Sequence, residues 1–82
     1  MSSTRTIALA AVRSLPPDER RRIREAGGLS QGDVARGIGC SASAVRLWER
    51  GTREPSGPLG ERYGLLLSDL KRLSYAPDEE TT

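Results

Sequence analysis

The sequence contains no histidine and no phenylalanine, and it has a single cysteine, Cys40, and a single tryptophan, Trp48. One thiol cannot form an internal disulfide, and one thiol without histidine cannot complete a zinc site. No residues are spaced as a nucleophile with its general base, or as a glycine-rich loop around a phosphate. We therefore expect no enzyme, no metal, no other cofactor and no small-molecule ligand.

Long apolar runs are also missing. The apolar stretch from Ile7 to Val12 is far shorter than a membrane-spanning helix, and it lacks the cleavage context of a signal peptide. Charged residues make up 29% of the chain, which again disfavours a membrane span. Together with the single cysteine, these features predict a cytoplasmic protein with no membrane partner.

Charge is present but unevenly distributed along the chain. The formal net charge is +2, and Asp78, Glu79 and Glu80 lie close to the C-terminus. Without these three residues, the acidic count falls from 11 to 8 against 13 lysines and arginines, which suits a polyanionic partner. A length of 82 residues predicts one domain, over residues 1–75, followed by a disordered acidic tail over 76–82.

Residues 30–38 carry the signals of a short helix. Val34, Ala35 and Ile38 have the spacing of one helix face, and Ala35 is small enough for a close helix crossing. Ser30 is placed as the N-cap, and Asp33 stands at the capping-box position. This segment is therefore predicted to be the first of two helices in a motif over residues 30–51.

A tight turn and a second helix follow. Gly39 can adopt a positive φ, which lets the chain reverse direction at little steric cost. Ser41 is placed to cap a helix whose inward residues are Val45 and Trp48, three apart, and Gly51 ends it. The pattern predicts two short helices packed across a glycine turn.

Three more helices are expected around this motif. Residues 5–14 place apolar side chains at helical spacing, and Pro16-Pro17 separates them from a basic helix that reaches Ala26. From a cap at Ser56, one unbroken helix is predicted with an apolar face formed by Leu59, Tyr63, Leu66, Leu67, Leu70 and Leu73. The predicted fold class is all-α, a compact bundle of about five helices with an extra N-terminal helix and one long C-terminal helix.

The motif ends with Trp48-Glu49-Arg50-Gly51 and is followed by Arg53-Glu54-Pro55. Together with Leu29-Ser30-Gln31, Val34-Ala35, Ile38-Gly39 and Val45, this pattern resembles the helix-turn-helix of the Cro and phage-repressor family, also called the xenobiotic-response-element type. The resemblance spans residues 20–55. It implies a small transcriptional regulator of a bacterial or phage-infected cell, associated with the nucleoid, that binds double-stranded DNA sequence-specifically, acts as a repressor by occupying its operator and forms a homodimer on two half-sites.

The resemblance also implies roles for individual residues. Base contacts fall on Ala42, Ser43, Arg46 and Leu47, and contacts to the DNA backbone fall on Gln31, Ser41, Arg50, Thr52 and Arg53. Structural roles fall on Gly39 in the turn, on Trp48 as core anchor, and on Arg24 and Glu49 as an ion pair between helices. The chain departs from the family at Ala42 and Leu47, which are apolar where long polar side chains are usual. Those two can contact thymine methyl groups, and Arg46 is the candidate for guanine.

Several alternatives stay open. Leu47 beside two alanines also fits a protein-interaction module on the same scaffold, such as an antitoxin or a recombination accessory factor. The helix over 5–14 either covers the core of its own chain or forms a dimer contact. Arg20, Arg21, Arg22 and Arg24 form either a solvated face with Ile23 turned inward or contacts to phosphate. Gly60 and Gly64, four residues apart, indicate either the close approach of another helix or loose packing.

Overall fold

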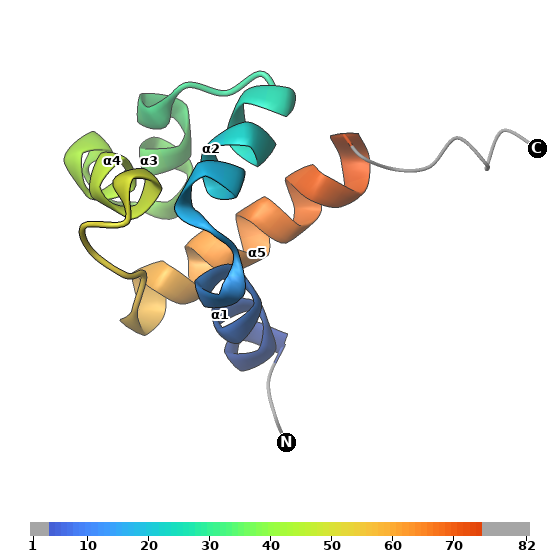
Figure 1. Cartoon of the computed structure of the whole chain (residues 1–82), viewed down its shortest axis with the longest axis vertical. Coiled ribbons are helices and arrows are strands. Elements are labelled where there is room, and N and C mark those ends of the chain that lie inside the picture. Colours follow the sequence, from blue (N-terminus) through green and yellow to red (C-terminus); the bar gives the residue numbers. More distant parts are fainter. Residues whose placement is uncertain (1–3, 75–82) are drawn as a thin grey trace, which may run out of the picture.

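The computed structural model describes residues 4–74, in which five helices form the all-α bundle expected from the sequence (Figure 1). The helices are α1 (Thr4–Ser14), α2 (Pro17–Ala26), α3 (Gln31–Ile38), α4 (Ala42–Arg50) and α5 (Gly57–Ser74). The predicted acidic tail over 76–82 lies outside the described residues. Within residues 4–74, no helix is both long enough and apolar enough to cross a membrane.

Two prolines separate α1 from α2. Pro16 is extended (φ −61°, ψ 146°), and Pro17 occupies the first position of α2. Proline suits that position because it has no N–H to leave unpaired and its φ is already helical. The chain therefore turns between the two helices, and α1 lies against α5 (Figure 1).

The start of α3 and the turn between α3 and α4 have the geometry predicted from the local sequence. Ser30 and Asp33 form a capping box, in which the Ser30 hydroxyl accepts the Asp33 N–H (3.0 Å) and the Asp33 carboxylate accepts the Ser30 N–H (2.9 Å). Gly39 ends α3 with φ 88°, a left-handed conformation that favours glycine, and its N–H donates to the Ala35 carbonyl (2.8 Å). Ser41 caps α4, so both helices begin where the sequence indicates.

Helix α5 is continuous over 18 residues, as predicted, and two glycines let other segments approach it closely. A Cβ atom on Gly64 would lie 2.5 Å from the Ala8 carbonyl oxygen of α1. A Cβ atom on Gly60 would lie 2.8 Å from the carbonyl carbon of Pro55. The glycines therefore mark a close helix crossing rather than loose packing, and α1 covers the core of its own chain.

Trp48 and Tyr63 lie at the centre of the core. Their ring centroids are 4.5 Å apart, and Trp48 is 4% exposed, so its indole packs inside the protein. The remaining core side chains come from all five helices and are Val12, Ile23, Val34, Ala35, Ile38, Val45 and Leu67. Cys40 is half-buried and packs against this core as a small side chain.

Three apolar side chains assigned to the core by spacing lie instead at the surface. Ile7 is 64% exposed and Leu73 is 74% exposed, and Ala11 is also exposed. In α1, the face that meets α5 is centred on Ala8 and Val12, which turns Ile7 and Ala11 away. In α5, Leu73 lies beyond Leu70, whose side chain packs against the end of α2 at Gly27.

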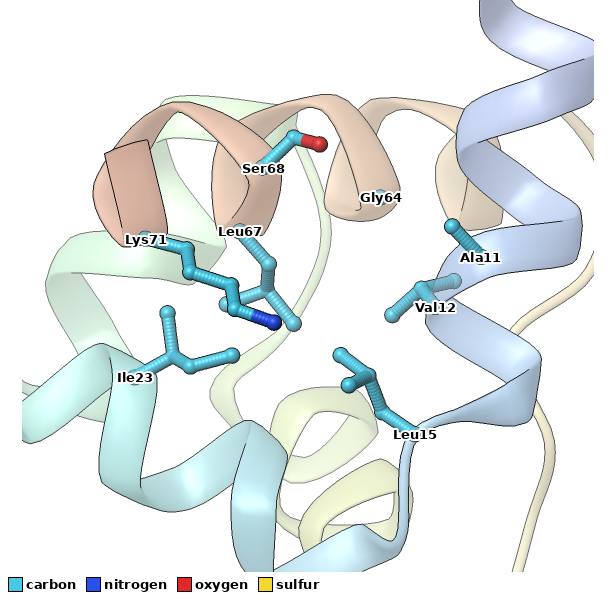
Figure 2. A pocket seen from close by; sticks show the side chains of 8 residues that line it. All are labelled: Ala11, Val12, Leu15, Ile23, Gly64, Leu67, Ser68 and Lys71. Atoms are coloured by element: carbon cyan, nitrogen blue, oxygen red, sulfur yellow. The ribbon is translucent and has the colours of Figure 1, made fainter. Parts of the chain in front are cut away.

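An apolar groove runs between α1, α2 and α5 (Figure 2). Its volume is about 110 Å³, and Leu15, Ile23 and Leu67 converge on it, while the Lys71 side chain extends toward it from α5 and the Ser68 hydroxyl points away. The groove opens beside the exposed Ala11, so this part of α1 and α5 presents apolar surface to solvent. The alternative that α1 forms a dimer contact stays a prediction.

Candidate nucleic-acid interface

Three buried side chains fix the orientation of α4 about its own axis. Val45, Trp48 and Glu49 all face the protein interior. Because residues three and four apart share a helix face, their burial leaves the opposite face of α4 in solvent. Most of the side chains to which the resemblance assigns base contacts lie there, namely Ala42, Ser43 and Arg46, and Arg50 is exposed as well.

The Leu47 side chain is half-buried, whereas its assignment to a base contact predicts an exposed side chain. The chain turns back beneath it after α4, and the Thr52 N–H donates to the Leu47 carbonyl (3.1 Å). Gly51 makes this turn possible with φ 79°. Thr52 and Arg53 follow on the surface, so the loop after α4 continues the exposed face of that helix.

A buried ion pair connects α2 to α4. The Arg24 guanidinium donates to both carboxylate oxygens of Glu49, and the Nη2–Oε1 distance is 3.0 Å. The Arg24 and Glu49 side chains are 10% and 4% exposed. The hydrogen bond to Glu49 raises the pKa of Arg24, which keeps the guanidinium charged. These two residues thus make the pair that the resemblance implied.

Gln31 joins the same cluster from the start of α3. Its Nε2 donates to Glu49 Oε1 (3.1 Å), and Arg24 Nη1 donates to the Leu29 carbonyl (2.8 Å). The carboxylate of Glu49 therefore has partners on both α2 and α3. This arrangement fixes the side chain of Gln31 beside the first turn of α4.

Arg20 is a buried residue that the sequence reasoning placed at the surface. It is 1% exposed, and its guanidinium donates to the carbonyls of Val12 (3.1 Å) and Trp48 (2.9 Å) and to Glu54 Oε1 (2.9 Å). It therefore links the end of α1, the end of α4 and the loop that carries Arg53. The available signal was its position three residues before Ile23, which puts both on one face of α2.

The exposed arginines fall into two groups. Arg21, Arg22, Arg36 and Arg72 each form an ion pair with a nearby carboxylate on their own helix. Within the part of the chain that the structure describes, five exposed arginines form no ion pair, namely Arg13, Arg46, Arg50, Arg53 and Arg62. Three of these five arginines lie on α4 and the loop after it, and this unpaired positive charge attracts anions.

Two open depressions lie on this face. The larger, of about 300 Å³, is lined by polar and charged side chains from three helices, namely Arg21, Arg24, Glu25, Gln31, Arg46, Glu49 and Arg50. The smaller, of about 110 Å³, is lined by Gln31, Ala42, Ser43 and Arg46. Gln31 and Arg46 border both depressions. The two depressions thus bring together Gln31, Ala42, Ser43, Arg46 and Arg50, whereas Ser41, Leu47, Thr52 and Arg53 line neither of them.

Comparison with protein families gives one match. Residues 21–62, just over half of the chain, match the helix-turn-helix family model HTH_3. The matched range begins in α2, contains α3, α4 and the following loop, and ends within α5. Neither the curated proteins nor the solved structures gave a match to this chain.

Proposed function

The chain belongs to the helix-turn-helix family of DNA-binding regulators, and we propose that it binds double-stranded DNA sequence-specifically and represses transcription by occupying an operator. The observation that carries this proposal is the solvent face of α4, where Arg46 and Arg50 lie beside the exposed Ser43 and have no ionic partner among residues 4–74. Bound to DNA in this way, the protein would associate with the nucleoid of a bacterial or phage-infected cell.

The proposed complex places α4 in the major groove. That groove is about 12 Å wide and admits one helix, and its base edges carry distinct patterns of donors, acceptors and methyl groups. Arg46 would bind a guanine through two hydrogen bonds, and Ser43 can donate to or accept from a base edge. Gln31, Ser41, Arg50, Thr52 and Arg53 are assigned to the sugar-phosphate backbone, where they set the position of α4.

We also propose that two copies bind one operator. A single short helix contacts only a few base pairs, and dimers of this architecture read half-sites about 34–36 Å apart on one face of the duplex. An analytical ultracentrifugation titration with a short duplex measures the stoichiometry directly. Two chains per duplex support the dimer, and one chain at saturation contradicts it without affecting the proposal of DNA binding.

The decisive experiment compares two arginines against a matched control. Arg46→Ala should flatten the preference among sequences, because it removes a base contact. Arg53→Ala should weaken all duplexes alike and lower the slope of log affinity against log salt by about 1. Arg72→Ala, at an exposed arginine paired with Asp69 near the end of α5, should change neither quantity.

Equal effects of Arg46→Ala and Arg53→Ala would contradict the division between base and backbone contacts. A failure to bind any duplex at low salt would contradict the function itself. That second outcome would favour the alternative of a protein-interaction module, such as an antitoxin or a recombination accessory factor, for which the half-exposed Leu47 on α4 is the supporting observation.

A further inference from the structure

The smaller depression at the start of α4 has a composition that distinguishes it from the rest of this face. Three of its four lining residues are polar, and the fourth, Ala42, is exposed and apolar. A long side chain at position 42 would occupy this space, whereas the single methyl group of alanine leaves it open. The hollow is therefore a consequence of the apolar residue at which this chain departs from its family.

Two parts of the hollow, Gln31 and the first turn of α4, are fixed by contacts elsewhere. The Gln31 side chain is held in place, because its Nε2 donates to the buried carboxylate of Glu49 (3.1 Å). Ser43 and Ala42 belong to the first turn of α4, which Ser41 caps through a hydrogen bond to the Ala44 N–H (3.1 Å). Gln31 and the first turn of α4 are thus already ordered in the free protein, which lowers the cost of ordering that part of the hollow on binding.

Ala42 gives this largely polar hollow a single apolar contact, and the major groove offers one kind of apolar group to match it. The C5-methyl of thymine is the single apolar group that the four base pairs present there. Guanine, adenine and cytosine would instead place a donor or acceptor against the methyl group of Ala42 and leave it without a partner, which costs free energy. On the basis of the proposed function, we infer that the hollow formed by Gln31, Ala42, Ser43 and Arg46 receives the methyl group of a thymine.

The position of Arg46 adds a second element to the half-site. Arg46 lies four residues after Ala42, or about 6 Å along the axis of α4. This separation corresponds to about two base-pair steps of about 3.4 Å each. A guanine bound by Arg46 therefore lies within about two base pairs of the thymine that enters the hollow.

The test begins with the full chain and a random duplex library. Selection gives the preferred duplex, and Arg46→Ala identifies the guanine on which that preference depends. Each thymine of the selected duplex is then replaced singly by deoxyuridine, which removes only the methyl group, and Kd is measured by fluorescence anisotropy at fixed salt. One replacement within about two base pairs of the guanine should weaken binding about fourfold, the value expected for one buried methyl group.

Two variants connect this effect to the hollow. Ala42→Gln fills it, so the same uracil replacement should then change Kd by less than about twofold. Arg72→Ala, at the far end of α5, leaves the hollow unchanged and should retain the full sensitivity to uracil. A melting curve followed by circular dichroism establishes that both variants fold. If Ala42→Gln unfolds, Ala42→Gly replaces it, because glycine removes the apolar surface without filling the space.

The failure of this inference is distinguishable from that of the proposed function. A duplex bound sequence-specifically with no effect of uracil near the guanine would overturn the thymine site and leave the function intact. An equal uracil effect in wild type and Ala42→Gln would also overturn the site. The absence of any selected duplex would overturn the proposed function, and the thymine site with it.

Discussion

Arg24 on α2 and Glu49 on α4 form a doubly hydrogen-bonded ion pair in the interior, and Gln31 on α3 donates to the same carboxylate. Glu49 therefore accepts hydrogen bonds from two helices other than its own. A buried ion pair is costly to break from one side, because the remaining charge is left without a partner. The relationship thus predicts a structural rather than a base-reading role for both charges.

Glu49→Ala should destabilise the protein strongly. We expect a loss of about 3 kcal/mol in the free energy of unfolding, because the Arg24 charge stays buried. In a chain of this size, that loss lowers the melting temperature by more than about 10 °C, measured by circular dichroism. Arg24→Met combined with Glu49→Leu is the control and should recover most of the loss. Unchanged melting combined with lost DNA binding at low temperature would contradict the structural role.

Arg20 and Arg21 are adjacent on α2, but their removal should change the stability of the protein by very different amounts. Arg20→Met removes the hydrogen bonds to the carbonyls of Val12 and Trp48 and leaves Glu54 without its ionic partner, and we expect a loss of about 3 kcal/mol or more. Arg21→Met removes only an exposed pair with Glu25 and should change stability by less than about 0.5 kcal/mol. Urea denaturation of the two variants measures the difference, and equal midpoints would contradict the linking role of Arg20.

The α3–α4 motif could be predicted from sequence because its signals are local. Ser30, Asp33, Gly39 and Ser41 each act on backbone groups within a few residues, so their types at fixed spacing specify where helices begin and end. The Arg24–Glu49 pair is different, since its partners are far apart in the chain. It followed from the resemblance to a family and not from spacing.

Other features depend on how the helices are placed in three dimensions. Arginine is almost never fully buried unless it is paired, so the four arginines of α2 indicated a solvated face. Arg20 is buried because the ends of α1 and α4 both bring carbonyl groups to it. Ile7 and Leu73 have helical spacing, but within the described part of the chain no neighbouring side chain covers them. Their exposure follows from the rotation of α1 and the length of α5, which periodicity does not specify.

Two glycine-to-alanine substitutions should change stability with opposite signs. Gly64→Ala would place a Cβ atom 2.5 Å from the Ala8 carbonyl oxygen, so α1 must move and about 1–3 kcal/mol should be lost. Gly37→Ala, in α3, has no atom within 4 Å of the new Cβ and should gain about 0.5–1 kcal/mol from the higher helix propensity of alanine. Thermal melting of both variants provides the comparison. A gain in stability for Gly64→Ala would contradict the close crossing of α1 and α5.

Tyr63 carries a buried hydroxyl without a hydrogen-bond partner among the described residues. Burial raises the pKa of this phenol, so it stays neutral throughout the physiological range. Tyr63→Phe removes the unpaired group and keeps the ring against Trp48, and we expect stability to be retained or to rise by about 1 kcal/mol. Tyr63→Leu loses the ring contact and should lower stability by about 2 kcal/mol or more. Destabilisation by Tyr63→Phe in urea titrations would show that the hydroxyl has a partner.

Asp33 should make the stability of the protein depend on pH in the acid range. The backbone N–H of Ser30 lowers the pKa of Asp33 below its ordinary value of 3.8, and the Ser30 side chain and Arg36 add to this effect. Because the pKa is lower in the folded state, the carboxylate stabilises the fold fully above about pH 4, and the contribution is lost as pH falls through the folded value. The difference in unfolding free energy between wild type and Asp33→Asn should therefore be largest near neutral pH and shrink below about pH 4. Urea titrations between pH 7 and pH 2 test this expectation. If the difference in unfolding free energy between wild type and Asp33→Asn stayed constant over that range, protonation of the Asp33 carboxylate would not be coupled to unfolding.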